Sequence, residues 1–228
     1  MLETLKHTTV ATLATVLRQQ GLRNVWLQGP KPIRDGQPRI VGPAFTIRFV
    51  PAREDMTTAE SMRGPRSVRA AIESMPTGCI VVADTGGCTQ AGAFGDITCA
   101  RMRHRDVRGL VIDGAVRDLA GLRELNWPVW ACGTAAPPSL AQLQCVDFQV
   151  PIGCAGVAVW PYDLIVADDD GAIVIPAAVA AAVAETAREK DQLEEWILER
   201  VKDGEALGGL YPSDATTLAR FRADIKGD

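Results

Sequence analysis

The chain has 228 residues, of which 47% are apolar and 23% are charged, a balance typical of a globular protein with a sizeable core. Its formal net charge is −4, and its Lys and Arg residues are scattered, which argues against a basic nucleic-acid-binding face. No apolar run reaches the length of a membrane span. We therefore expect neither nucleic acid nor a membrane as a partner.

The cysteines and the N-terminal segment indicate the compartment. Six cysteines are present and none forms a CxxC pair, which argues against a structural zinc site. The first twenty residues are too polar for a secretory signal peptide. We expect a cytoplasmic protein with reduced thiols, most of which fill the core.

The predicted elements of the first half alternate between helix and strand. A helix is expected over 8–20, beginning near Thr8 or Thr9 and ending at Gly21. After a turn-rich loop, strand structure is expected over 40–50, interrupted at Gly42-Pro43. Further helices are predicted over 67–75, 97–105 and 118–126. Further strands are predicted over 79–84, 109–113 and 128–133.

The second half begins with a strand-rich stretch, 148–176, in which Asp170-Gly171 between two apolar runs predicts a hairpin. The acidic DDDG run there lacks the spacing of a calcium loop, so a solvated turn is expected. A long helix follows from Ala177 to Gly204, and a short helix ends the chain. The pattern predicts one α/β domain over 1–228 with a C-terminal helical extension from about 177.

The most informative stretch is 95–118, which opens on Gly95-Asp96 and closes on Arg117-Asp118. Gly95-Asp96 ends a glycine-rich loop and begins a predicted helix. The free N–H groups of a helix N-terminus favour a carboxylate or phosphate ligand. The alternative is that Asp96 only caps its helix, a position for which aspartate is favoured.

Arg117 and Asp118 follow the predicted strand 109–113 and a short loop. Polar groups just beyond the carboxyl end of a strand are a common site position in α/β folds, and guanidinium suits a carboxylate. Asp118 could again be only a helix cap. The residues three positions after the two aspartates, Cys99 and Gly121, do not complete capping boxes.

Residue chemistry limits the kind of site. With only two histidines, in separate segments, a histidine-rich zinc or iron site is not expected. Carboxylates would favour a hard divalent ion, Mg²⁺ or Mn²⁺, that keeps several waters. The sequence contains neither a GxSxG serine-nucleophile motif nor a P-loop. The residues alone indicate an α/β domain with a small-anion site.

Five blocks of the sequence carry a family resemblance: VGPAFTIRF, IVVADTGGCTQAGAFGD, RGLVIDGAVRDLAGLRELNWPVWA, DLIVADDDGAIVIP and DGEALGGLYP. In this order they resemble the RraA-like family, which includes metal-dependent pyruvate aldolases and regulators of ribonuclease activity. Asp96, twenty intervening residues, then Arg117-Asp118 match the aldolase signature of that family. The resemblance implies stacked β-sheets with flanking helices, of the swivelling β/β/α type, in a homotrimer or homohexamer with sites between subunits.

The resemblance also implies residue roles. Arg117 would contact the carboxylate or keto oxygen of the substrate, Asp118 would hold the metal, and Asp96 would position a catalytic water. Gly95 and the amides of Ile97 and Thr98 would bind the pyruvyl carboxylate. A glutamate of the late helix would reach the metal waters of a neighbouring subunit, and Glu194 and Glu195 match this position loosely.

Two residues depart from the family pattern. Gly121 stands where many members carry an acid, and Tyr162 interrupts a Pro-Gly-Asp turn. Neither change removes a residue assigned to chemistry. The part of the substrate beyond C4 has no assigned contact, and Arg53 or residues of a neighbouring subunit are candidates.

The expected activity is metal-dependent cleavage of 4-hydroxy-2-oxo acids, such as 4-hydroxy-4-methyl-2-oxoglutarate, to pyruvate, with oxaloacetate decarboxylation through the same enolate. The alternative is a non-catalytic regulator that binds ribonuclease E or a helicase. A lyase acting on sugar-derived 2-oxo acids is a weaker third hypothesis. A methyltransferase role is disfavoured because no glycine fingerprint for a nucleoside cofactor is found.

Overall fold

The computed structural model describes residues 1–225, and its largest sheet is organised around one long strand, β3 (Ile40–Pro51). On one side β3 pairs in parallel with β4 (Ile80–Asp84), and the parallel order continues through β5 (Gly109–Ile112) and β7 (Val129–Ala131). On the other side it pairs with the antiparallel hairpin β12 (Leu164–Asp168) and β13 (Gly171–Ile175). The two-residue strands β1 (Trp26–Leu27) and β2 (Lys31–Pro32) lie at the two ends of the sheet, and β9 (Leu143–Phe148) pairs antiparallel with the second half of β3.

The parallel and antiparallel parts stack against each other. Successive strand residues point to opposite faces, so in β4 Val81 and Ala83 face one core while Ile80 and Val82 face another. That second core also contains the inward residues of β12 and β13, so it lies between the two parts. The hairpin of β10 (Ile152–Cys154) and β11 (Val157–Val159) contributes to it as well.

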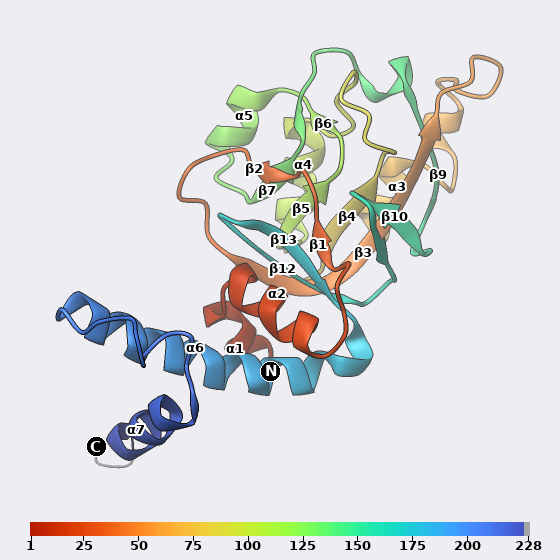
Figure 1. The fold of residues 1–228 in the computed structure, drawn as a ribbon. Coiled ribbons are helices and arrows are strands. Elements are labelled where there is room, and N and C mark those ends of the chain that lie inside the picture. The colour runs from red at the N-terminus through yellow and green to blue at the C-terminus, as the bar shows by residue number, and fades with distance from the viewer. Residues whose placement is uncertain (226–228) are drawn as a thin grey trace.

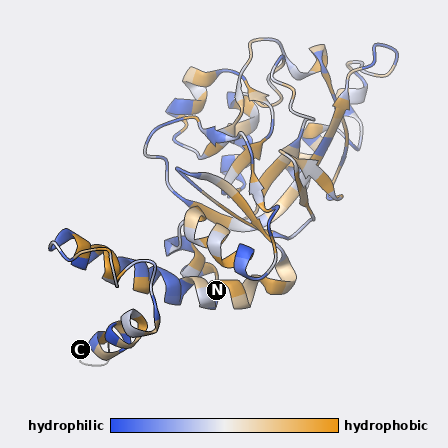
Figure 2. Cartoon of the chain, in the orientation of Figure 1, coloured by the Kyte–Doolittle hydropathy of each residue, from blue (hydrophilic) through white to orange (hydrophobic). Residues whose placement is uncertain are grey.

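Helices cover the two outer faces (Figure 1). The parallel part is covered by α3 (Val68–Ser74), α4 (Asp96–His104) and α5 (Leu119–Glu124). The antiparallel hairpin is covered by α1 (Leu2–His7), α2 (Val10–Gln19) and α6 (Ala180–Lys202). Apolar colour concentrates on the strands and on the helix faces turned toward them (Figure 2). This arrangement confirms the predicted fold of stacked β-sheets with flanking helices.

Two predicted elements differ in detail. The N-terminal helix is preceded by a separate short helix, α1, and α2 begins after Thr9, whose hydroxyl accepts a hydrogen bond from the Thr12 N–H (3.0 Å). The expected break at Gly42-Pro43 was wrong, because β3 runs through it without interruption. A Cβ on Gly42 would lie 2.6 Å from the Gly78 carbonyl oxygen, so this glycine permits a close backbone approach within the strand.

The Asp170-Gly171 turn joins β12 to β13 as predicted, and Asp168 pairs with Gly171 at its end. Asp168 Oδ1 accepts a hydrogen bond from the Asp170 N–H (3.0 Å), while Oδ2 accepts one from the Val10 N–H (2.9 Å) at the start of α2. The carboxylate of the acidic run is therefore used to hold a turn and a helix N-terminus.

Two short strands that the sequence did not predict lie in or beside the stretch 95–118. They are β6 (Ala115–Val116) and β8 (Gly133–Thr134), which pair in parallel. β6 occupies the segment expected to be a loop before Arg117. It fixes the position of that arginine relative to the preceding glycine-rich loop.

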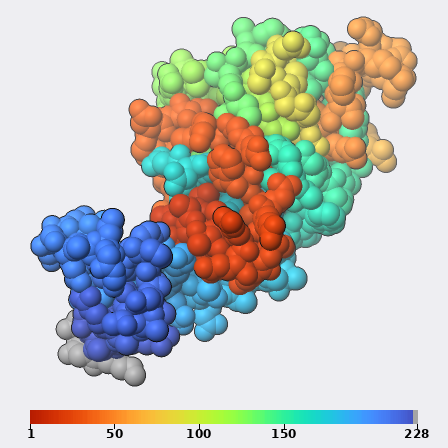
Figure 3. All heavy atoms as spheres, viewed as in Figure 1, coloured from red at the N-terminus to blue at the C-terminus, as the bar shows by residue number. Residues whose placement is uncertain are grey.

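The C-terminal extension leaves the body of the molecule (Figure 3). The distal half of α6 packs with α7 (Ala215–Ile225) in a small separate core of Leu193, Trp196, Ile197, Leu210 and Phe221. Within residues 1–225, no helix has both the length and the apolar character needed to cross a membrane.

Candidate active site at the start of α4

The first half of the site is the N-terminal turn of α4. Gly95 occupies the cap position, its N–H donates to Thr98 Oγ1 (3.1 Å), and the Thr98 hydroxyl donates to the Gly95 carbonyl (2.8 Å). Asp96 is the first helical residue, so the alternative that it only serves as the N-cap was wrong. Its Oδ1 accepts a hydrogen bond from the Ile97 N–H (2.7 Å), and a carboxylate at this position is favoured by the helix dipole.

The second half is Arg117-Asp118, between β6 and α5. Asp118 has left-handed backbone angles (φ 57°, ψ 44°), a conformation that aspartate tolerates better than most residues. Although it stands at the cap position of α5, its side chain makes no capping hydrogen bond. Its Oδ2 instead accepts one from Arg117 Nε (3.2 Å). Simple helix capping therefore does not account for Asp118.

The two halves are packed into each other. A Cβ on Gly95 would collide with Asp118 Oδ2, and a Cβ on Gly121 would lie 2.6 Å from Asp96 Oδ2. Each aspartate side chain thus rests against a glycine of the opposite half. The structure brings Asp96, Arg117 and Asp118 together, as the signature predicts.

Two further contacts fix the arginine beside the glycine-rich loop. A Cβ on Gly92 would lie 2.5 Å from Arg117 Cβ, and the Arg117 N–H donates to the Phe94 carbonyl (2.9 Å). The glycines at 92, 95 and 121 are therefore required by close contact. Gly121, a departure from the family pattern, provides the space that the Asp96 carboxylate occupies.

A buried aspartate that the sequence analysis missed holds the loop behind the site. Asp113, at the end of β5, is 5% exposed and accepts hydrogen bonds from the Thr85 N–H and hydroxyl (both 2.7 Å). It also accepts bonds from the N–H groups of Gly87 and Ala155 (both 3.3 Å). The sequence showed only an aspartate at the end of a predicted buried strand. The groups that donate hydrogen bonds to it lie in distant segments, so no local pattern indicated its role.

Asp84 plays a related part at the end of β4. Its carboxylate accepts hydrogen bonds from the N–H groups of Gly86 (3.0 Å) and Gly153 (3.3 Å). Burial raises the pKa of the Asp84 carboxyl above its ordinary value, against the lowering effect of these two hydrogen bonds. Asp84 and Asp113 therefore tie the glycine-rich loop to the ends of neighbouring strands.

The amides expected to bind a carboxylate differ in availability. The Gly95 N–H is already used by Thr98, and the Ile97 N–H is used by Asp96. The Thr98 N–H belongs to the first helical turn, whose donors have no intrahelical acceptor. Gly95 therefore contributes by having no side chain, which leaves room for the Asp118 carboxylate. An anion can bind the Ile97 N–H only if it displaces the Asp96 carboxylate.

The surroundings of Asp96 are open. Ile97 is 82% exposed although its side chain is large and apolar. With Asp96 and Gly121 it lines a shallow depression between α4 and α5. The side chains of Arg117 and Asp118 are 36% and 39% exposed. These groups are accessible to a small molecule.

The donor set fits a hard divalent ion held largely through water. The site offers carboxylate oxygens from Asp118 and Asp96 and no histidine or thiolate, and Mg²⁺ commonly binds through one or two carboxylates. Among residues 1–225, no group of three or more His, Cys, Asp or Glu side chains is arranged to hold a metal. The protein would therefore supply few direct ligands.

Glu194 and Glu195 lie elsewhere in the same chain. Both stand on α6, which covers the opposite face of the molecule from α4 and α5 (Figure 1). Glu194 pairs with Lys190 (2.8 Å) and accepts a hydrogen bond from the Thr12 hydroxyl (3.3 Å). Glu195 lies on the helix surface beside Trp196 and Phe221. One chain does not bring these glutamates to Asp118.

Comparison with known proteins finds relatives that match most of this sequence. The family model described as RraA-like, Aldolase/RraA, matches residues 10–174. A Halalkalibacterium halodurans protein named "Putative 4-hydroxy-4-methyl-2-oxoglutarate aldolase" is 33% identical over 70% of this chain and 70% of its own length. Protein DlpA of Legionella pneumophila is 32% identical over 64% of this chain, and this match spans only 23% of DlpA.

A solved structure supports the same relationship. Streptomyces coelicolor RraAS2, described as an unusual member of the RNase ES inhibitor RraA protein family, superposes with a TM-score of 0.77 at 32% identity. The match covers 86% of this chain and 93% of RraAS2. The chain belongs to the RraA-like (Aldolase/RraA) family.

Proposed function

We propose that the protein is a divalent-metal-dependent aldolase that cleaves 4-hydroxy-2-oxo acids to pyruvate. The observation that carries this proposal is the mutual packing of Gly95-Asp96 with Asp118 and Gly121. It places an arginine and two carboxylates beside a helix N-terminus, and the Asp118 carboxylate caps no helix. The name of the Halalkalibacterium relative points to the same activity.

The arrangement suits the charges of a 2-oxo acid. The N–H groups in the first turn of α4, including that of Thr98, favour binding of the substrate carboxylate. The Arg117 guanidinium donates to the keto oxygen, on which negative charge develops during cleavage, and stabilisation is most effective where charge develops. Mg²⁺ or Mn²⁺ held at Asp118 would supply a second positive charge facing that oxygen.

The bond changes follow from this orientation. A water held by the Asp96 carboxylate takes the proton of the C4 hydroxyl, and C4 becomes a carbonyl as the C3–C4 bond breaks. The electron pair of that bond forms the enolate of pyruvate, stabilised by Arg117. The same water returns that proton to C3 of the enolate, which gives pyruvate with no net uptake or release of protons. Loss of CO₂ from oxaloacetate gives the same enolate, so decarboxylation of oxaloacetate is proposed as a second activity.

Pyruvate release, measured by lactate dehydrogenase and NADH consumption, tests the proposal. The substrates are 4-hydroxy-4-methyl-2-oxoglutarate and oxaloacetate, each with Mg²⁺, with Mn²⁺ and with EDTA. Turnover that requires the metal and is lost in Arg117→Met supports the assignment. Turnover that persists in EDTA contradicts metal dependence, and absence of turnover on both substrates contradicts the aldolase.

A regulatory role is the second candidate, because RraAS2 is described as belonging to a family of RNase ES inhibitors. Immobilised ribonuclease E distinguishes the two. Retention of the protein on the column, together with no turnover of either oxo acid, supports the regulator. Turnover without retention supports the enzyme.

We also propose that the site is completed by a neighbouring copy in a trimer or hexamer. The apolar residue Ile97 is 82% exposed beside Asp96, and Glu194 and Glu195 lie on α6, away from Asp118 of the same chain. Light scattering after size exclusion measures the assembly. A monomer that retains full activity would contradict this proposal.

A further inference from the structure

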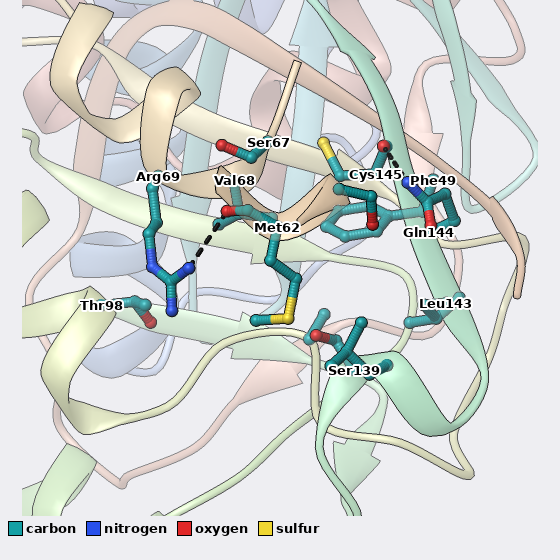
Figure 4. Close-up of a pocket in the computed structure, with 13 residues that line it drawn as sticks. Phe49, Met62, Ser67, Val68, Arg69, Thr98, Ser139, Leu143, Gln144 and Cys145 are labelled. Atoms are coloured by element: carbon teal, nitrogen blue, oxygen red, sulfur yellow. Dashed lines mark hydrogen bonds between the residues drawn. The ribbon is translucent and has the colours of Figure 1, made fainter. Parts of the chain in front are cut away.

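A cavity of about 110 Å³ opens next to the candidate site (Figure 4). Its floor is apolar and includes Phe49 of β3 and Leu143 of β9, while Met62 and Arg69 stand on the other side. Thr98 of α4 lies on its wall, so the cavity borders the helix turn proposed to bind the oxo acid. It is large enough to receive a few non-hydrogen atoms of a ligand.

The cavity and the arginine-aspartate pair border the same short segment. Ala93 and Thr98 line the cavity, while Gly92 and Gly95 contact Arg117 and Asp118. A molecule seated over the first turn of α4 is thus next to both Arg117 and the cavity.

The hydroxyl groups of the cavity are largely committed to the protein itself. The Ser67 hydroxyl accepts a hydrogen bond from the Ala70 N–H (3.2 Å) at the start of α3. Ser61 Oγ donates to the Thr58 carbonyl (2.8 Å), and Thr98 Oγ1 bonds to the backbone of Gly95. A polar ligand in the cavity would therefore have to bind mainly to other side chains.

Arg69 has free donors. Its Nη1 donates to the Met62 carbonyl (3.1 Å), and among residues 1–225 it forms no ion pair. Arg101 and Arg105, also near α3, are both paired with Glu73. In Figure 4 the Arg69 side chain extends from α3 toward the side of the cavity on which Thr98 lies. A guanidinium with free N–H groups binds a carboxylate well. The cavity thus offers an apolar floor and, at its rim, a guanidinium with free N–H groups.

We infer that this cavity receives the part of the substrate beyond C4, and that Arg69 selects substrates that carry a second carboxylate there. This inference rests on the proposed function for the identity of the reaction. Arg117 and Arg69 then hold the two ends of a dianion across the first turn of α4. Arg69 is a specificity-determining residue that contacts the substrate away from the bond that breaks.

Binding of unreactive oxo acids tests the inference without any turnover. The probes are 2-oxoglutarate and 2-oxopentanoate, which have the same chain length and differ by one carboxylate, in the presence of Mg²⁺ by calorimetry. The wild type is expected to bind 2-oxoglutarate about tenfold more tightly, and Arg69→Met to bind both alike. Arg69→Lys keeps the charge but loses the bidentate geometry of the guanidinium, so it should retain part of the preference for 2-oxoglutarate.

Arg66→Met is the matched control, because Arg66 is exposed three residues away and does not line the cavity. It should leave the preference unchanged. Equal affinities in the wild type, or an unchanged preference in Arg69→Met, would overturn the inference.

Turnover provides the second readout. With 4-hydroxy-4-methyl-2-oxoglutarate, Arg69→Met should raise KM about tenfold with little change in kcat, whereas 4-hydroxy-2-oxopentanoate should be cleaved as by the wild type. An equal loss on both substrates contradicts a role in selecting the second carboxylate. If the wild type shows the binding preference but cleaves neither substrate, the proposed function fails while the Arg69 assignment stands.

Discussion

Two aspartates five residues apart, Asp113 and Asp118, are used in opposite ways. Asp113 is buried and its carboxylate accepts four hydrogen bonds, from Thr85, Gly87 and Ala155. Asp118 is partly exposed and its carboxylate accepts one, from Arg117. A carboxylate with all its acceptor sites filled stabilises a fold, whereas one left partly free is available to a metal or a substrate.

The largest expected effect is on activity at Asp118. Asp118→Asn keeps a side chain that tolerates the left-handed backbone but removes the charge that would hold the metal. We expect kcat/KM for pyruvate release to fall about 1,000-fold, since electrostatic groups at such positions are worth that much. Urea unfolding should show a change in stability within about 0.5 kcal/mol. A variant with near-normal turnover would contradict the assigned role.

Asp113 should show the reverse pattern. Asp113→Ala leaves the buried N–H groups of Thr85, Gly87 and Ala155 without their acceptor. We expect the free energy of unfolding to fall by about 3 kcal/mol, measured by urea denaturation. Any loss of activity should follow from loosening of the glycine-rich loop. A stability equal to that of the wild type would show that these hydrogen bonds contribute nothing net.

A smaller effect is expected at Gly121, which separates the Asp96 side chain from α5. In Gly121→Ala the new Cβ would lie 2.6 Å from Asp96 Oδ2 and 3.0 Å from Asp96 Cβ, so the carboxylate must move. We expect kcat to fall about tenfold, since small displacements of catalytic groups lower rates strongly.

Gly208→Ala is the matched control, because a Cβ there meets nothing within 4 Å and its φ is not positive. Its kcat should equal that of the wild type. If Gly121→Ala behaves the same way, Asp96 does not need its present position.

The smallest effect concerns pH. Burial raises the folded-state pKa of Asp84 above its unfolded value of 3.8. The folded protein then binds more protons at this site, so the stability contributed by Asp84 is greatest below pH 3.8 and decreases as pH rises through its folded pKa. Urea unfolding of both proteins from pH 4 to pH 6 should show the stability of the wild type falling, relative to that of Asp84→Asn, as pH rises. The same slope in both proteins would assign it to other groups.

The sequence predicts local elements well and contacts between distant segments poorly. Strands β4 and β5 are continuous, buried, mostly apolar runs with clear boundaries, so the sequence pattern predicts them. The two-residue strand β6 has no such pattern because it is stabilised by pairing with β8, far along the chain. The break predicted at Gly42 was wrong, because this glycine is there to let the Gly78 carbonyl oxygen approach the strand closely.

The candidate site shows the same division. The signature spacing brought Asp96, Arg117 and Asp118 to attention, and the structure places them together. Their mutual packing depends on Gly95 and Gly121, and no local pattern indicates that these glycines contact the aspartates. The proposed role of Glu194 or Glu195 concerns contacts between subunits, which no local sequence pattern encodes.

The long helix α6 contributes to two separate cores. Ala187 packs in the core beneath the antiparallel hairpin, and Trp196, nine residues later, packs against Phe221 in the C-terminal core. At 1.5 Å and about 100° per residue, the helix fixes both the separation of these cores, about 13 Å along its axis, and their relative orientation. Inserting one residue between them would turn the whole distal part, with Glu194 and Glu195, by more than a quarter of a circle. The number of residues in this helix is therefore as constrained as their identity.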